Sequence, residues 1–564
     1  MSTMELLQPV DNAFRDLFDL RGNWFFAFDK GKDKTYETGV ARQMSVPVPA
    51  ALQDLFVSPE ERTYCGTMWY ERSVFVPKRW LGSDVFLRFD GIGSRAVVYV
   101  NGMEVGRPEG AFVTSTLNVT RQLRYGEDNR IVVKVNNELS AYSLPAGQVI
   151  TSPKGRRINQ PNFSYDVPSG IYGNVTLYTV PTTRLTDVAI QTVELSTEQA
   201  VVQYMAHVQG NCLVTATLRD REGRIVATGV GGNAKLVVEN PQIWTIGEGY
   251  LYTLELEVSR LGKQHDMYAL RIGIRTVAIE SGNFTLNGTV IRLKGQQFTG
   301  NVNQLTVNPI QAKQRLLQVL ATGGNCIFSN GQPLSPEILQ LADECGVLVV
   351  AEMPAAGLQA KDLQQGEANF SKSDIKSRLL DTHKNTIDFL ITRDKNHPSI
   401  VSWSLLYNPL TMMKDDEAYY KEIAETAIQS DWEHRPLALT VKQPLSQIWT
   451  GNLNSYSLLL LSAWSNQWQM DGEVLQSLMY KELVEWQAKQ SERALAVLLG
   501  PEFSSLNSVG TGNTSMSTSY VANREQSEKV KILLAMLSSM PNVQGQFLQN
   551  GVVGLDETIM QSWK

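Results

Sequence analysis

The sequence predicts a multidomain protein of mixed β and α/β class, in which two β-sandwich domains precede a (β/α)8 TIM barrel. Residues 1–180 and residues 181–276 both consist of short strand-like runs separated by turn signals. Residues 277–564 instead alternate helical periodicity with short apolar runs, which is typical of a parallel α/β fold. A chain of 564 residues is also too long for one hydrophobic core, so several domains are expected.

The first domain is predicted to be a jelly roll or a related β sandwich. Three runs of β-branched and aromatic residues have strand length: Val85–Asp90, Ala96–Val100 and Arg130–Val135. Turn signals such as Asn101-Gly102 lie between them. Because no helical stretch separates these runs, we expect antiparallel sheets that pack face to face.

Residues 181–276 are predicted to form a second sandwich. The runs Leu213–Leu218 and Tyr252–Val258 have the composition of strands, as do Ala200–Tyr204 and Lys235–Val238. Roughly a hundred residues of this kind is the size of an immunoglobulin-like domain.

Residues 277–564 carry the pattern of a barrel. The helical stretch Pro336–Cys345 is followed at once by Val347–Ala351, an uninterrupted apolar run that indicates a buried parallel strand. Further helices are expected at Gln311–Ala321, Ile375–Ile391, Asp416–Ser430, Glu473–Gln490 and Gln526–Met540, and further strands at Ile400–Ser404 and Ala494–Leu499. The run Ser504–Ser519, rich in Ser, Thr and Gly, is expected to be a loop. This alternation predicts a TIM barrel.

The composition argues against several classes of function. A net charge of −6 gives no reason to expect nucleic acid or an anionic membrane as a partner. No apolar run has the length of a membrane-spanning helix, and the first residues lack the basic start and apolar centre of a signal peptide. The cysteines Cys65, Cys212, Cys326 and Cys345 show no paired spacing, so we expect reduced buried thiols, no metal site and no cofactor. These features predict a cytoplasmic protein.

Several longer motifs follow one another along the chain. They are Trp69–Arg72, Leu87–Asp90, Tyr99–Gly102, Val135–Leu139, Ser169–Gly173, Gly247–Tyr252, Leu270–Arg275 and Arg393–Val401, the last followed by Trp403 and Ser404. Together they resemble the β-glucuronidases of glycoside hydrolase family 2. The resemblance implies a sugar-binding-like jelly roll over residues 1–180, an immunoglobulin-like sandwich over 181–276 and a catalytic-type barrel over 277–564. It also implies retaining hydrolysis, which needs one carboxyl group as acid/base and another as nucleophile.

The position of the family's acid/base holds another residue. In the β-glucuronidases, Trp-Ser is followed within a short turn by Asn-Glu-Pro, whose Glu is the acid/base. The run Trp403–Pro409 instead sets Tyr407 at the motif's Asn and Asn408 at its Glu. A one-residue shift would return Asn to the place beside Pro409 but would still supply no Glu. Because an amide cannot donate or accept the proton, the sequence predicts lost or impaired acid/base catalysis.

The resemblance places the nucleophile at Glu502. The family ends this strand with Thr/Ser-Glu-Tyr-Gly, whereas here Pro501 and Phe503 flank the glutamate. The alternative is that Glu502 is a solvated side chain that opens the loop after the strand.

Other positions of the family's sugar site also differ. Trp464 stands where the family has a Tyr beside the nucleophile, and Asn550 belongs to its strand-eight element. The run Phe328–Pro333 lacks the family's Arg and His, and the Asn-x-Lys motif that binds the glucuronate carboxylate is missing. Glu352 matches the family's glutamate that shapes the barrel mouth, and a structural role is favoured over proton transfer. The candidate substrate-binding residues are Glu352, Tyr407, Trp464 and Asn550.

Two other polar groups are interpreted as structural. His397 belongs to an Asn-His-Pro turn, which it is expected to fix. Asp415, Asp416 and Glu417 could supply an alternative acid, but acidic residues at a helix start are favoured by the helix dipole.

Three functions remain open. The first is a degenerate glycosidase, catalytically inactive or strongly impaired, that is retained for carbohydrate binding or protein assembly. The second is an active retaining β-glycosidase of the β-glucuronidase type with Glu502 as nucleophile. The third is an interaction protein with an unidentified protein partner. The resemblance also implies a homo-oligomer. We favour the first function because several substitutions fall within one site.

Overall fold

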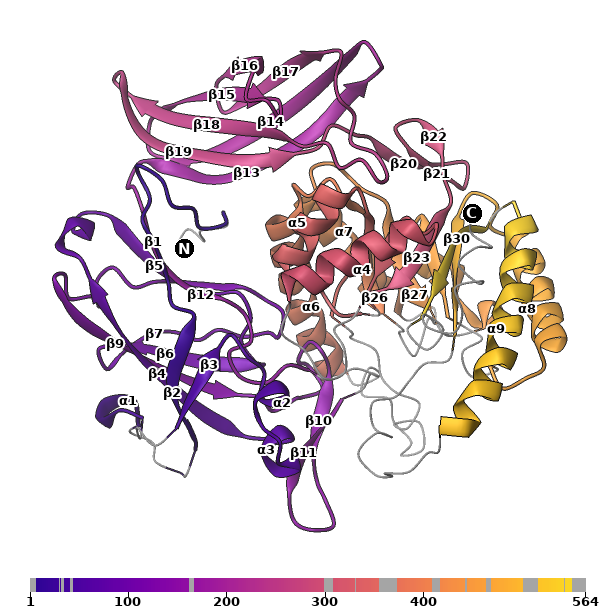
Figure 1. The fold of residues 1–564 in the computed structure, drawn as a ribbon, viewed down its shortest axis with the longest axis horizontal. Coiled ribbons are helices and arrows are strands. Elements are labelled where there is room, and N and C mark those ends of the chain that lie inside the picture. Colours follow the sequence, from indigo (N-terminus) through magenta and orange to yellow (C-terminus); the bar gives the residue numbers. More distant parts are fainter. Residues whose placement is uncertain are drawn as a thin grey trace.

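The computed structural model contains two β sandwiches and a barrel, with the barrel beside both sandwiches (Figure 1). It describes residues 7–29, 31, 35–40, 44–161, 167–298, 308–329, 331–354, 373–407, 416–441, 444–462, 468–500, 516–541 and 543–549. In these ranges no helix has both the length and the apolar character that crossing a membrane requires. The predicted fold class is confirmed.

The first domain is a jelly roll of two main antiparallel sheets. Its strands are β1 (Leu17–Asp19), β2 (Gly22–Phe28), β3 (Ser45–Val48), β4 (Thr67–Val76), β5 (Asp84–Phe89), β6 (Arg95–Val100), β7 (Met103–Gly106), β8 (Ser115–Asn118), β9 (Glu127–Asn136), β10 (Gly147–Thr151), β11 (Arg157–Pro161) and β12 (Val175–Val180). Between them lie α1 (Thr35–Thr38), α2 (Leu52–Leu55), α3 (Pro59–Arg62) and the 3-10 helix η1 (Lys78–Trp80). One sheet has the order β3-β2-β4-β9-β6-β7 and the other β1-β12-β5-β8, while β10 pairs with β11. Trp24 and Val133 from the first sheet pack with Leu87 and Leu177 from the second.

The second domain is an immunoglobulin-like sandwich. Its strands are β13 (Arg184–Leu195), β14 (Gln199–Gln209), β15 (Leu213–Arg219), β16 (Ile225–Val230), β17 (Asn233–Glu239), β18 (Tyr252–Arg260) and β19 (Lys263–Ile272). The sheets have the orders β13-β14-β17 and β16-β15-β18-β19. Tyr204 and Leu236 on one sheet meet Leu218 and Leu256 on the other, because alternate side chains of each strand face the core.

The third domain is a closed barrel of parallel strands. In order around the barrel these are β23 (Leu293–Gln297), β24 (Cys326–Phe328), β25 (Leu348–Glu352), β26 (Ile400–Tyr407), β27 (Leu437–Val441), β28 (Leu458–Leu461), β29 (Ala494–Leu499) and β30 (Val543–Leu548). The helices around it are α4 (Pro309–Ala321), α5 (Pro336–Cys345), α6 (Ser373–Asp394), α7 (Glu417–Ser430), α8 (Gly472–Gln487) and α9 (Met516–Ser539), with the 3-10 helices η5 (Leu445–Gln447) and η6 (Thr450–Leu453).

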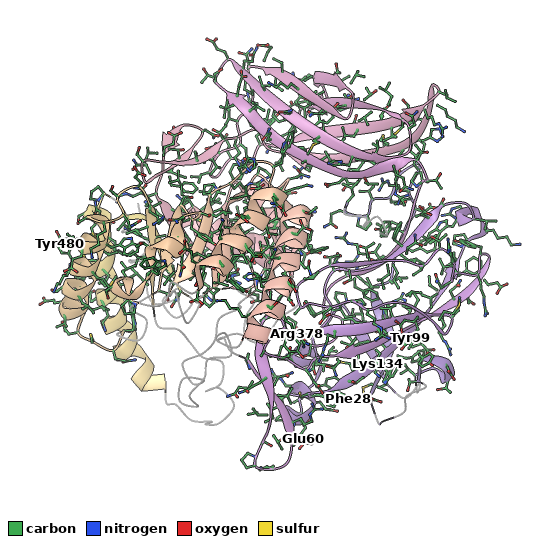
Figure 2. All side chains as sticks on the ribbon, turned by 180° about the vertical axis from the view of Figure 1, so that it is seen from behind. Phe28, Glu60, Tyr99, Lys134, Arg378 and Tyr480 are labelled. Atoms are coloured by element: carbon green, nitrogen blue, oxygen red, sulfur yellow. The ribbon has the colours of Figure 1, made fainter. Side chains whose placement is uncertain are left out.

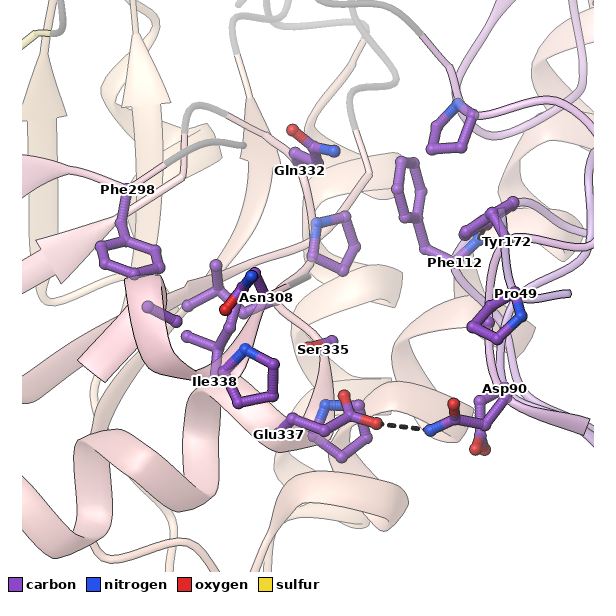
Figure 3. Close-up of a pocket in the computed structure, with 18 of the residues that line it drawn as sticks. Pro49, Asp90, Phe112, Tyr172, Phe298, Asn308, Gln332, Ser335, Glu337 and Ile338 are labelled. Carbon is purple, nitrogen blue, oxygen red and sulfur yellow. Dashed lines mark hydrogen bonds between the residues drawn. The ribbon is translucent and has the colours of Figure 1, made fainter. Parts of the chain in front are cut away.

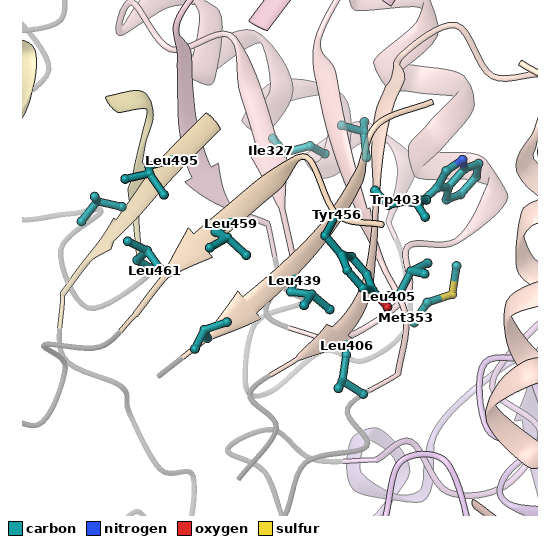
Figure 4. Packing of buried hydrophobic residues seen from close by; sticks show 14 of the residues in the cluster. Ile327, Met353, Trp403, Leu405, Leu406, Leu439, Tyr456, Leu459, Leu461 and Leu495 are labelled. Atoms are coloured by element: carbon teal, nitrogen blue, oxygen red, sulfur yellow. The ribbon is translucent and has the colours of Figure 1, made fainter. Parts of the chain in front are cut away.

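Barrel strands β28 and β29 are apolar without interruption because both of their faces are buried. In β28, Leu458 and Leu460 belong to the core inside the barrel, whereas Leu459 and Leu461 belong to the core under the helices. Figure 4 shows side chains of this outer core, including Leu439, Leu459 and Leu495, on neighbouring strands. This arrangement explains why the strand sequences show no alternation of polar and apolar residues.

The amino-terminal end of the barrel is covered by a small sheet. Its strands are β20 (Val277–Glu280), β21 (Asn283–Leu286) and β22 (Thr289–Val290). Phe284 and Leu286 of β21 pack with Leu293 and Phe547 inside the barrel. A Cβ on Gly295 would lie 2.0 Å from a ring carbon of Phe547, so the aromatic filling of the barrel requires glycine there.

The observed boundaries differ from the predicted ones in two informative places. Strand β26 runs to Tyr407, three residues beyond the predicted end at Ser404. Helix α9 begins at Met516, so the last four residues of the predicted loop Ser504–Ser519 are helical. Ser and Thr lower helix propensity only modestly, and tertiary packing overrides such weak preferences.

Candidate functional site

Two of the predicted site residues lie at the barrel mouth, by which we mean the carboxyl ends of strands β23–β30. Glu352 is the last residue of β25, and Tyr407 is the last residue of the neighbouring strand β26. Parallel barrel strands end together at this mouth, where barrels carry their active sites. The other predicted positions, Asn408, Trp464, Glu502 and Asn550, lie outside the described residues.

Glu352 is buried and both of its carboxylate oxygens accept hydrogen bonds. Oε2 accepts from the backbone N–H groups of Ser329, at 2.8 Å, and Gly331, at 3.1 Å. Oε1 accepts from the hydroxyl of Thr440 on β27 at 3.1 Å. A buried carboxylate requires such donors to offset its desolvation. Here they connect the end of β24 to β27, so Glu352 positions the backbone of the mouth.

The hydrogen bonding continues from Glu352 along the strand ends. The hydroxyls of Ser404 and Thr440 are 3.3 Å apart. Because Thr440 donates its only proton to Glu352, Ser404 is the donor in this second bond. The pairing of β26 with β27 shifts between Ser404 and Leu406, a bulge of the kind that redirects side chains next to active sites.

Two positions that the sequence analysis identified separately, Gly331 and Tyr407, are in contact. Tyr407 is 2% exposed. Gly331 has a φ of +75°, and a Cβ on it would lie 2.7 Å from the Cβ of Tyr407. A side chain at 331 would therefore be strained and would also clash with this tyrosine. Tyr407 thus fits sterically against Gly331, which belongs to the run Phe328–Pro333 that lacks the family's Arg and His.

His383 on α6 forms a hydrogen bond to strand β26. This residue was not identified from the sequence. Its Nε2 donates to the carbonyl of Leu405 at 2.8 Å, because a carbonyl oxygen can only accept. Its Nδ1 then accepts from the hydroxyl of Tyr419 on α7, at 3.0 Å. Burial lowers the pKa of His383 to about 4, so the imidazole is neutral near pH 7. The ring therefore fixes the strand two residues before Tyr407.

The buried imidazole of His383 is expected to make the free energy of unfolding depend on pH. The dependence lies between 6.5, the ordinary pKa of histidine, and about 4, the pKa of His383 in the folded chain. In this range the unfolded chain binds a proton that the folded chain excludes, so the free energy of unfolding falls as the pH drops. His383→Gln, which does not titrate, should flatten the profile by up to about 3 kcal/mol at the acid end. Urea unfolding of both proteins from pH 7 to pH 4 measures this. Exposed His207→Gln is the matched control, and parallel profiles for wild type and His383→Gln would contradict the assignment.

The opposite end of β26 is held by the second domain. Arg275, which follows β19, is 3% exposed and forms an ion pair with Glu433. Its Nε donates to the carbonyl of Pro398 at 2.9 Å, and its Nη2 donates to that of Ile400 at 3.0 Å. Since Ile400 is the first residue of β26, Arg275 connects the sandwich domain to the start of this strand.

His397 fixes the turn that leads into β26. Its Nδ1 lies 2.5 Å from a carboxylate oxygen of Asp343 on α5, whose other oxygen accepts from the backbone N–H of Ser399 at 3.0 Å. Burial alone would lower the pKa of His397, but the Asp343 carboxylate outweighs it and the pKa is raised. These contacts agree with the turn-fixing role expected from the sequence.

The residues considered as alternative acids make structural contacts where the structure describes them. Asp416 is 3.1 Å from the ammonium of Lys376, and a carboxylate oxygen of Glu417 accepts from Trp449 Nε1 at 3.2 Å. Asp415 lies outside the described residues. In the described ranges, no group of three or more His, Cys, Asp or Glu side chains could hold a metal ion.

A cavity of about 320 Å3 lies between the jelly roll and the barrel, beside the loop that bonds Glu352 (Figure 3). Phe112 and Tyr172 line it from the jelly roll, and Phe298 and Gln332 from the barrel. Its charged groups already have protein partners, including Arg315, whose guanidinium lies over the ring of Phe298. Glu337 accepts from the Asn174 amide at 2.8 Å, and Arg393, Arg21 and Asp90 form ion pairs with Asp394, Asp19 and Arg88 respectively. We interpret this cavity as part of the seam between the domains.

Comparison with known proteins matches each of the three domains to the same family. The model of the glycosyl hydrolases family 2 sugar binding domain matches residues 17–181, the glycosyl hydrolases family 2 model matches 176–275, and the family 2 TIM barrel domain matches 277–520. A β-glucuronidase of Paenibacillus borealis is 31% identical over 457 residues, which cover 78% of this chain and 75% of that protein. The chain belongs to glycosyl hydrolase family 2.

Other relatives of this family 2 chain are also β-glucuronidases. That of Rattus norvegicus is 30% identical over 456 residues, covering 74% of this chain and 67% of the relative. The crystal structure of Ruminococcus gnavus β-glucuronidase has a TM-score of 0.87 and 28% identity, and covers 97% of this chain and 92% of that one. The same enzyme in complex with D-glucaro 1,5-lactone also has a TM-score of 0.87, at 28% identity and with 97% and 93% coverage. The resemblance to β-glucuronidases is confirmed.

The sequence of this family 2 barrel does contain a pattern from which the burial of His383 could have been predicted. The residues Leu379, His383 and Ile387 are spaced four apart, and the first and last of them are buried apolar residues. A histidine within such a stripe faces the core and must find hydrogen-bond partners there. The partners themselves, Leu405 and Tyr419, could not be inferred because they lie on other elements.

Proposed function

We propose that this β-glucuronidase-like family 2 protein binds a carbohydrate at its barrel mouth and hydrolyses glycosidic bonds weakly or not at all. The observation that carries the proposal is Asn408, which directly follows Tyr407 at the end of β26. Retaining hydrolysis needs a proton donor at this motif. An amide is nearly the shape of a carboxyl group but cannot transfer the proton, and losing an acid/base group costs on the order of 10²–10⁴ in rate.

The contacts of Glu352 support the proposal. Its two oxygens accept from Ser329, Gly331 and Thr440, which suits a positioning group better than a second acid. The buried Tyr407 packed on Gly331 adds bulk in place of the amide that the family motif would supply. These neighbours favour a mouth adapted to binding.

The alternative is an active retaining β-glycosidase with Glu502 as nucleophile. The similarity of the whole chain to a β-glucuronidase with a TM-score of 0.87 favours it. A substrate with a good leaving group needs little acid assistance, so a nucleophile alone could form the glycosyl-enzyme intermediate.

Binding and turnover measured on the same protein distinguish the two functions. We expect D-glucaro 1,5-lactone to bind in a calorimetric titration while 4-nitrophenyl β-glucuronide is hydrolysed at least about 10²-fold more slowly than by an active relative. The matched control is Glu502→Gln. Hydrolysis at the relative's rate that disappears in Glu502→Gln would establish the active alternative. Absence of lactone binding would argue against carbohydrate binding at the mouth and favour an unidentified protein partner.

We also propose a cytoplasmic location. All four cysteines are free, and Cys65, Cys326 and Cys345 are buried. Unpaired thiols are typical of proteins from a reducing compartment. Only Cys212 departs from the expectation of burial, since it is partly exposed.

A further inference from the structure

The cavity at the seam between the jelly roll and the barrel has the size and the walls of a ligand site. Its volume of about 320 Å3 corresponds to about ten water molecules, which is far more than imperfect packing leaves in a protein interior. Prolines, whose rings are rigid, line it from both domains: Pro49, Pro168, Pro309, Pro333 and Pro336. Small-molecule sites occur preferentially at domain interfaces, in cavities of this size with mostly apolar walls.

Contacts along the seam hold the two walls of the cavity together. Leu144 of the jelly roll is 2% exposed and packs into the core under the barrel helices. Arg378 on α6 lies over the ring of Tyr142, 5.4 Å from its centroid, and Figure 2 shows it where the barrel meets the jelly roll. Next to the cavity itself, the amide of Asn174 donates to Glu337 at 2.8 Å. The cavity therefore lies between two domains that are fixed to each other.

The wall from the jelly roll is built around Phe112. This residue has a φ of +68°, a left-handed conformation that residues other than glycine rarely adopt. Its backbone N–H donates to the hydroxyl of Tyr172 at 2.7 Å, and the two rings meet edge to face with their centroids 6.2 Å apart. Strained backbone of this kind persists where its surroundings fix it, and it is common at ligand sites. The Phe112 ring is thus in place before a ligand arrives, which lowers the entropic cost of binding.

The wall from the barrel is apolar and includes one buried hydroxyl without a partner. Phe298, Ala312 and Ile338 on this wall belong to the core between the barrel strands and helices, so the cavity lies outside the ring of strand ends. The hydroxyl of Ser335 is buried and has no hydrogen-bond partner among the described residues. Figure 3 shows Phe112 and Phe298 on opposite sides of the cavity, with Ser335 between them. A ligand that bonds to Ser335 would remove the cost of this unpaired group.

The charges and helix ends around the cavity are compensated within the protein. Besides the ion pairs described above, the guanidinium of Arg315 lies 4.4 Å from the centroid of the Phe298 ring. The side chain of Asn308 accepts from two backbone N–H groups at the start of α4, at 3.1 and 3.2 Å. Glu337 lies in the first turn of α5, where its carboxylate offsets the helix dipole. A charged ligand would therefore lose its hydration without gaining an unpaired counter-charge, so a neutral ligand is favoured.

We propose that this cavity binds a neutral aromatic alcohol, whose ring packs against Phe112 and Phe298 and whose hydroxyl forms a hydrogen bond with Ser335. A sugar fits less well, because each of its several hydroxyls would need a partner in a cavity with mostly apolar walls. The site goes beyond the proposed function, since it lies between two domains and uses none of the residues at the barrel mouth. Its test therefore does not depend on whether the mouth binds a carbohydrate.

Titration with 2-naphthol tests the class of ligand. This fluorescent aromatic alcohol, like tyrosine, keeps its proton at pH 7. We expect it to bind the full chain at one site with a Kd of roughly 10–100 μM. 2-Naphthoate, which carries a carboxylate on the same ring system, should bind at least about tenfold more weakly. Equal affinity for the two compounds, or binding of methyl β-glucoside in place of 2-naphthol, would overturn the proposal.

Substitutions on the two walls test the location. Ser335→Ala should weaken 2-naphthol binding about fivefold through the lost hydrogen bond, and Phe112→Gly about tenfold through the lost ring. Glycine adopts a φ of +68° readily, so Phe112→Gly should keep the fold, which circular dichroism checks. The matched control is Phe75→Ala, which removes a 54% exposed ring of the jelly roll outside the cavity and should leave the Kd unchanged. A wild-type chain that does not bind 2-naphthol, or binding that both cavity variants leave unchanged, would refute the assignment.

Discussion

Replacing Asn408 with glutamate is expected to raise the rate of aryl β-glucuronide hydrolysis by about 10²-fold or more. The substitution returns a carboxyl group to the position that directly follows β26. With a nucleophile at Glu502, this carboxyl would protonate the leaving group and later deprotonate the attacking water. We expect the lower end of the usual 10²–10⁴ range, because Tyr407 still stands where the family has the amide that binds the sugar 2-hydroxyl.

The measurement is the steady-state kcat/KM with 4-nitrophenyl β-glucuronide and with an alkyl glucuronide. The gain should be larger for the alkyl substrate, whose poor leaving group needs the proton more. Asn408→Gln is the matched control, since it adds the same length without an acid, and it should show no gain. Combining Asn408→Glu with Glu502→Gln should abolish the gain. An unchanged rate in Asn408→Glu would mean that the acid is not the missing group, or that Glu502 is not the nucleophile.

The architecture could be predicted because it depends on local patterns. The run Ala494–Leu499 is apolar at every position because both faces of β29 are buried, and its place between two helical stretches predicted a barrel strand. The strand-like composition of residues 181–276, with no helical stretch between the runs, predicted the second sandwich in the same way. Local patterns could not predict where β26 ends. The three residues after Ser404 are held in the strand by partners on β27 and by His383, which are distant in the sequence.

The site was only partly predictable for a related reason. Glu352 could be placed at the mouth because it ends a recognisable strand, yet its donors Ser329 and Thr440 come from segments 23 residues before it and 88 residues after it. The fit between Gly331 and Tyr407 is likewise invisible in one sequence, since each is read there as a separate loss. Two substitutions that lie far apart in the sequence can therefore belong to one steric change, because the two residues are in contact in the structure.

Replacing Arg275 with methionine is expected to lower the free energy of unfolding by about 2–3 kcal/mol. Methionine keeps much of the volume, so the loss would come from the charge and its hydrogen bonds. Glu433 would lose its ion pair with Arg275 but keep the one with Arg435, and the carbonyls of Pro398 and Ile400 would lose their donors. Because these groups lie between the sandwich and the start of β26, the amino-terminal end of this strand should loosen as well as the domain junction. Hydrogen exchange of β26 amides is expected to accelerate along with the change in stability.

A neighbouring arginine provides the matched control for this prediction. Arg271 lies four residues earlier and also reaches the barrel, where it is 2.8 Å from Glu344 on α5, but its side chain is 54% exposed. Solvent screens such a pair, so Arg271→Met should cost less than about 1 kcal/mol. The thermal midpoint should fall by roughly 3–5 °C in Arg275→Met and by about 1 °C or less in Arg271→Met. Equal shifts in the two variants would show that burial of Arg275 adds nothing to the junction. In that case β26 would be positioned from the barrel side alone, by His383 and by the turn that His397 fixes.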